Sequence, residues 1–118
     1  MKLETREIII ENVLRRTGMG GTHKGFWMMV WSISLALEDP MVLCAVTAAL
    51  YPRVAEICGM SKQCVMRDMR SLVEWCWNFG DREALYEIMG RRIIEKPTVG
   101  EFIDLVAGHI RSKGLTEL

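Results

Sequence analysis

Apolar residues recur every three to four positions through most of the chain, and glycines and prolines separate the runs, which is typical of a protein built from helices. The first run, over residues 4–16, ends before Gly18 and predicts an amphipathic helix. Two arginines in its last turn complement the helix dipole. We expect its buried face to consist of Ile8, Ile9, Val13 and Leu14.

Two further apolar runs occupy the middle of the chain. From Thr22 or His23 to Leu37 almost every residue is apolar, which predicts a central, largely buried helix; the run is too long for an ordinary strand. Pro40 suits the first turn of a following helix, so residues 41–50 are expected to form a second buried helix. The residues of that helix spaced for core contact are Val42, Leu43, Val46, Ala49 and Leu50.

Residues 51–80 have the form of a short helix, a tight turn and a long helix. Pro52 opens the first helix, Gly59 suits the left-handed position that ends it, and Ser61 is a good N-cap for the second. The pattern is that of a helix-turn-helix over about residues 52–79, whose second helix normally lies in the DNA major groove. The expected core residues of the long helix are Val65, Met69, Leu72, Val73 and Cys76.

The rest of the chain predicts a short helix over residues 82–89, a connector over 91–97 and a last helix over about 98–112. Thr98 and Glu101 have the spacing of a capping box at the start of that last helix. Since no segment predicts a strand, we expect an all-α fold, a compact helical bundle of about six to seven helices containing a helix-turn-helix. At 118 residues the chain is expected to form a single domain, 1–118.

The charge balance limits any affinity for DNA. The 15 basic and 15 acidic residues give a formal net charge of zero, whereas DNA-binding proteins normally carry a basic surface. Basic residues are concentrated before residue 25 and in residues 91–96, and acidic residues lie at 38–39 and 81–87. This distribution allows a one-sided basic face, with a modest and steeply salt-dependent affinity for DNA.

No pattern of an enzyme or a metalloprotein is present. The cysteines are never spaced as C-x-x-C, and neither His23 nor His109 completes a metal-ligand spacing. The glycine-rich residues 18–22 lack the preceding strand and the Gly-Lys-Ser/Thr ending of a phosphate-binding loop. We therefore predict no catalytic residue, no cofactor and no metal. Reduced thiols are expected at Cys44, Cys58, Cys64 and Cys76, three of them at positions that a helical pattern assigns to buried or half-buried faces.

Membrane and export signals are also missing from the pattern. Neither central apolar run reaches the roughly 20 residues of a membrane helix. The first ten residues carry charges where a signal peptide would be apolar. A cytoplasmic protein without membrane contact is expected.

The outward side of the long helix holds the candidate DNA-binding residues. Arg67 and Arg70 lie about one turn apart in its N-terminal half, where a recognition helix presents its base-reading residues. A plain solvent-exposed helix face, with Arg70 paired to Glu74, accounts for the same pattern. The candidate set is Lys62, Gln63, Cys64, Met66, Arg67, Arg70 and Ser71.

Three separated motifs, HKGF at 23–26, ALYPRVAEICGMS at 49–61 and EKPTVGEFIDLVAGHIR at 95–111, share their order and spacing with one family. At these places the family has IKGY, a VLYP-x-IA pattern and a KPTNSEFIAMVADKLR-like ending. From about Ile8 to Arg111, the chain thus resembles the C-terminal effector domain of the sporulation-initiation response regulator, stage-zero sporulation protein A.

The resemblance implies a helical domain that binds short boxes of double-stranded DNA, often as tandem or head-to-tail dimers. It also implies contact with the sigma subunit of RNA polymerase through about residues 78–92. The family's base-contacting arginine, glutamate and arginine match Cys64, Met66 and Arg67, so only Arg67 is retained. Cysteine and methionine cannot make the hydrogen bonds of the family's arginine and glutamate, and each good base contact that is missing costs roughly 1–3 kcal/mol of binding free energy. An altered base preference is therefore expected. Arg70 and Lys62 are expected to hold phosphates.

We therefore expect a sequence-specific transcriptional regulator with an altered base preference. The alternative is a protein-interaction module of the same fold that has lost specific DNA binding and acts on RNA polymerase or a full-length relative. The 118 residues themselves contain no receiver domain. If they are a whole gene product, phosphorylation of an aspartate in the same chain is not expected to control it.

Overall fold

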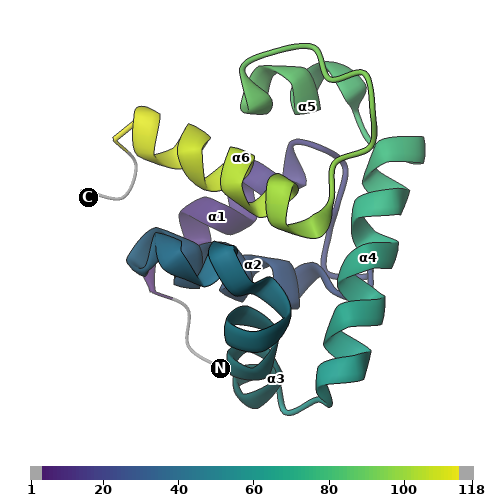
Figure 1. Ribbon diagram of the computed structural model, residues 1–118. Helices are drawn as coiled ribbons and strands as arrows, with labels where there is room; N and C mark the ends of the chain where they lie inside the picture. Colours follow the sequence, from purple (N-terminus) through teal and green to yellow (C-terminus); the bar gives the residue numbers. More distant parts are fainter. Residues whose placement is uncertain (1–3, 115–118) are drawn as a thin grey trace.

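The computed structural model of the protein describes residues 4–114 (Figure 1). Within this range the chain forms six α-helices and two short irregular helical segments, and no strand, which confirms the predicted all-α class. The elements in chain order are α1 Thr5–Arg15, α2 Phe26–Glu38, the 3₁₀ segment η1 Pro40–Ala45, the π segment η2 Val46–Leu50, α3 Tyr51–Cys58, α4 Lys62–Phe79, α5 Arg82–Met89 and α6 Val99–Ser112.

The central helix of the bundle is α2. It packs against α1, α3, α4 and α6, and its apolar sequence is buried on nearly every side, as predicted. The helix begins at Phe26 and not at Thr22 or His23, because Gly25 has a left-handed φ of +88° and residues 21–25 form turns. A residue in this conformation cannot continue a right-handed helix.

Gly25 also brings the start of α2 unusually close to α4. A Cβ atom on Gly25 would lie 2.7 Å from the backbone oxygen of Asp68 and 3.0 Å from its carbonyl carbon. The first distance is shorter than real Cβ atoms show and the second is unusually tight, so the glycine of the HKGF motif is favoured by packing as well as by its φ. The motif therefore fixes the N-terminus of α2 beside the middle of α4.

The buried face of α1 differs from the predicted one. Ile10 and Leu14 are buried as part of the core, but Ile8 is 45% exposed. Glu7 occupies the inward position instead, where its carboxylate accepts hydrogen bonds from Ser34 Oγ at 2.5 Å and from Arg6 Nε at 3.2 Å. Val13 and Leu14 are buried as predicted, and Ile9 is half-buried against the core. The prediction is wrong at Ile8, because the partners of Glu7 make it possible to bury a charged residue, which apolar periodicity does not anticipate.

Residues 40–50 do not form the predicted buried α-helix. They form η1 and η2, in which only Val42 and Leu50 are buried, while Met41 is 69% exposed. The prediction assumed 3.6 residues per turn, and the tighter 3₁₀ and wider π turns place the same residues on different faces. This segment is a surface connection between α2 and α3.

The C-terminal third follows the predicted pattern. α5 begins after Asp81, whose Oδ1 accepts a hydrogen bond from the Ala84 N–H at 3.1 Å. Thr98 and Glu101 make both hydrogen bonds of the predicted capping box, at 3.1 and 3.0 Å. α6 then packs on α2 and α5, with Phe102 among its buried residues.

Candidate nucleic-acid interface

A tight turn joins α3 to α4, as the sequence predicts. Gly59 has a left-handed φ of +66°, and the Met60 N–H donates to the Ala55 carbonyl at 3.0 Å, which closes the end of α3. Ser61 Oγ accepts a hydrogen bond from the Cys64 N–H at 3.1 Å and caps α4. Residues 59–61 thus set the angle at which α4 leaves α3.

One face of α4 packs on the core, and the opposite face lies in solvent. The helix runs along one side of the molecule, from the α3 turn at one end to α5 at the other (Figure 1). Its inward residues are the five that the pattern predicts, together with Asp68. The buried set is Val65, Asp68, Met69, Leu72, Val73 and Cys76.

The seven candidate DNA-binding residues all lie on α4, but they differ in exposure. Arg67 and Arg70 are exposed, whereas Met66 is half-buried and packs against the core. We call the outward face of α4 between Lys62 and Ser71 the candidate interface. Its other members are Gln63 and Ser71, which are exposed, and Lys62 and Cys64, which are half-buried.

Arg67 is held by two neighbours on its own helix. Its Nε donates to Asp68 Oδ1 at 3.1 Å, and its Nη2 donates to Cys64 Sγ at 3.6 Å. The side chain of Arg67 nevertheless remains 65% exposed. The hydrogen bond to Asp68 and the charge of that carboxylate raise the pKa of the Arg67 guanidinium, so it carries its positive charge throughout the physiological pH range.

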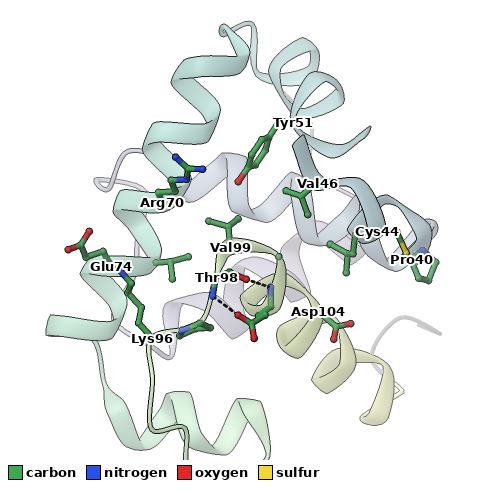
Figure 2. A pocket seen from close by; sticks show the side chains of 15 residues that line it. Pro40, Cys44, Val46, Tyr51, Arg70, Glu74, Lys96, Thr98, Val99 and Asp104 are labelled. Atoms are coloured by element: carbon green, nitrogen blue, oxygen red, sulfur yellow. Dashed lines mark hydrogen bonds between the residues drawn. The ribbon is translucent and has the colours of Figure 1, made fainter. Parts of the chain in front are cut away.

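Arg70 lies beside Tyr51 at one wall of a groove (Figure 2). Burial raises the pKa of Tyr51, and this effect outweighs the opposing charge of Arg70, so the tyrosine hydroxyl stays protonated near neutral pH. Within residues 4–114 no ion pair joins Arg70 to Glu74, although the helical spacing allows one. The charge of Arg70 is therefore not neutralised by that carboxylate.

The groove is an open hollow of about 900 Å³, lined by residues of α4, of the start of α6 and of η1 and η2 (Figure 2). Arg70 and Lys96 contribute cations to its lining, but Glu74, Glu101 and Asp104 contribute carboxylates. The mixed charge makes the groove a poor site for a polyanion. The solvent-facing side of α4 is thus the better candidate for contact with nucleic acid.

The family model described as “Sporulation initiation factor Spo0A C terminal” matches residues 10–110. The chain belongs to this family. The match extends from α1 to α6 and confirms the resemblance that the three motifs indicate. Membership identifies the chain as a DNA-binding effector domain of a sporulation regulator, in a family of DNA-binding domains and not of enzymes.

Two further features of the described residues concern membrane spans and metal ligands. The helical residues Pro40–Cys58 are long and apolar enough to cross a membrane by length and composition alone, and a single run of this kind is weak evidence for a membrane protein. Within the described residues no three His, Cys, Asp or Glu side chains gather closely enough to hold a metal ion.

Sequence reasoning did not anticipate the role of Asp68. Its side chain is only 7% exposed and pairs with the neighbouring Arg67. Adjacent residues on a helix do not generally face each other, so helical spacing gives no reason to expect this pair. The one available signal is an acidic residue next to Arg67, one of the candidate DNA-binding residues.

Proposed function

We propose that this domain is a transcriptional regulator that binds double-stranded DNA sequence-specifically through the outward face of α4. The observation that carries the proposal is Arg67, a charged and largely exposed side chain near the start of the second helix of a helix-turn-helix. In such a motif the N-terminal part of the second helix contacts base edges. An arginine there can donate two hydrogen bonds to O6 and N7 of guanine.

We also propose that the base preference differs from that of the family. The contacts of Cys64 and Met66 support this, since the Cys64 sulfur accepts from Arg67 and Met66 packs on the core. Neither side chain offers the hydrogen bonds of an arginine or a glutamate. Arg70 and Lys62 are proposed to contact phosphates, with Gln63 and Ser71 as further polar contacts.

Two protein partners complete the proposal: the sigma subunit of RNA polymerase and a second copy of this chain on neighbouring DNA boxes. The family resemblance implies both. Two exposed apolar side chains on the segments that flank α5 support a protein contact there: Phe79 at the end of α4 is 74% exposed, and Ile94 in the connector between α5 and α6 is 90% exposed.

The proposal can be tested with single substitutions and fluorescence anisotropy on a duplex that the wild-type domain selects. Arg67→Ala should weaken specific binding by about 1–3 kcal/mol and relax the preference at one base pair. Arg70→Ala should weaken binding to all sequences. The slope of log affinity against log salt concentration should fall by about 1, as expected for the loss of one phosphate contact. The control is Lys113→Ala, which removes an exposed cation just beyond α6. The named roles are wrong if all three variants bind alike.

A second candidate function is a protein-interaction module of the same fold without specific DNA binding. The zero net charge and the exposed Phe79 and Ile94 favour it. In that case Phe79→Ala should weaken binding to RNA polymerase or to a full-length relative. Arg67→Ala and the wild-type domain should then bind DNA equally weakly.

A further inference from the structure

We propose that Asp68 is a positioning residue that determines which edge of the Arg67 guanidinium faces the DNA. Through Arg67, it would fix a guanine preference at one base pair. This inference rests on the proposed function of the candidate interface. It goes beyond that function by assigning the selectivity to a residue that does not itself contact DNA.

Asp68 provides a fixed point for a mobile side chain. Its side chain is 7% exposed, and its backbone carbonyl lies against Gly25, where there is no space even for a Cβ atom. Arg67, in contrast, has a long side chain that is 65% exposed. Without an anchor an exposed arginine samples many rotamers, so the hydrogen bond from Nε to Asp68 at 3.1 Å restricts its direction.

The two contacts of Arg67 occupy one edge of its guanidinium. A guanidinium presents five N–H donors in a rigid plane, with one edge formed by Nε and Nη2 and the end formed by Nη1 and Nη2. Asp68 takes the Nε hydrogen, and the Cys64 sulfur takes an Nη2 hydrogen at 3.6 Å. The donors at the end of the side chain stay available. Their paired geometry suits the O6 and N7 acceptors of guanine.

A carboxylate at this place has two opposite effects on binding, which makes its role measurable. Its negative charge repels phosphates, so removing it should strengthen binding to any duplex or leave it unchanged. If Asp68 also orients Arg67, the same removal should reduce discrimination between bases. A residue that served only to stabilise α4 would change both kinds of binding in the same direction.

The test compares the wild-type domain with Asp68→Ala, Asp68→Asn and Glu74→Ala. The base pair to vary is the guanine position at which Arg67→Ala loses its preference. Each protein is titrated with the selected duplex, with the three duplexes that carry another base at that position, and with an unrelated duplex. Asp68→Ala should lower the guanine preference by about 5-fold or more, since a good bidentate contact of about 1–3 kcal/mol gives roughly 5- to 140-fold. Its affinity for the unrelated duplex should be equal or higher.

The matched variants separate hydrogen bonding from charge. Asp68→Asn keeps an oxygen that can accept from Arg67 Nε, so it should retain most of the guanine preference while losing the negative charge. Glu74→Ala removes a carboxylate from the exposed face of the same helix without touching Arg67, so its preference should equal that of the wild type. Equal losses in Asp68→Asn and Asp68→Ala would overturn the positioning role.

Because Asp68 is buried, Asp68→Leu serves as a second variant that fills the position with apolar volume and cannot accept a hydrogen bond. If Asp68→Ala or Asp68→Leu folds and its guanine preference equals that of the wild type, the inference is overturned. That outcome differs from failure of the proposed function, in which the wild-type domain itself would select no sequence.

Discussion

Replacing Gly25 with alanine should destabilise the domain by about 2–5 kcal/mol, because it disturbs the contact that joins α2 to the candidate interface helix. Two costs add up at this position. The φ of +88° is left-handed, which costs a residue with a Cβ atom roughly 1–2 kcal/mol. The new Cβ would also lie 2.7 Å from the Asp68 oxygen, and relieving such a clash in a packed region costs about 1–3 kcal/mol.

Two other glycines allow these costs to be separated. Gly59 has a φ of +66° but no atom within 4 Å of its hypothetical Cβ, so Gly59→Ala should cost only the backbone term of about 1–2 kcal/mol. Gly108 lies inside α6 with open space around it, so Gly108→Ala should stabilise by about 0.5–1 kcal/mol. From the most to the least stable, the expected order is therefore Gly108→Ala, wild type, Gly59→Ala, Gly25→Ala.

Thermal unfolding followed by circular dichroism would measure this series. At about 4 °C per kcal/mol for a domain of this size, Gly25→Ala should lower Tm by roughly 8–20 °C and Gly59→Ala by roughly 4–8 °C. If Tm falls by the same amount in both variants, the added Cβ at residue 25 causes no packing cost where α2 approaches α4, and the packing argument is refuted.

Three further effects should follow from individual contacts. Burial raises the pKa of the Glu7 carboxyl, but the hydrogen bonds from Ser34, Arg6 and the Glu4 N–H and the charge of Arg6 outweigh this effect, so the pKa lies below the ordinary value of a glutamate. The stabilisation by the Glu7 carboxylate should therefore be present above about pH 4.5 and be lost as the pH falls through the folded pKa, and Glu7→Gln should flatten this acid dependence of the urea midpoint. Thr98→Ala removes one half of the capping box and should cost about 1 kcal/mol in urea unfolding, whereas Thr98→Ser should restore most of it. Alkylation should label the exposed Cys44 first and Cys76 only on unfolding, since Cys76 is buried and burial raises the pKa of its thiol; equal rates measured by mass spectrometry would contradict this burial pattern.

The parts of the fold that sequence reasoning predicts well are those with local signals. Gly59 and Ser61 mark the turn between α3 and α4, and Thr98 marks the start of α6, because capping depends on residue types within one turn. The core stripe of α4 follows because a long amphipathic helix keeps a regular period. These signals are enough to predict the helix on which all seven candidate DNA-binding residues lie.

The features that sequence reasoning misses depend on contacts between distant segments or on irregular turns. Burial of Glu7 requires Ser34 on another helix, and no local pattern announces that partner. The 3₁₀ and π turns of residues 40–50 break the period on which the prediction relied. The pair of Arg67 with Asp68 involves a buried residue whose backbone carbonyl lies against Gly25, and this close approach is visible only when α2 and α4 are side by side.

Selection from a pool of randomised duplexes, at low and at near-physiological salt, tests the central claim most directly. The wild-type domain should enrich a short motif that contains a guanine, and the enrichment should persist at the higher salt concentration. Weak binding that vanishes with salt and enriches no sequence would contradict specific recognition by α4, and would leave the domain to act through protein partners instead.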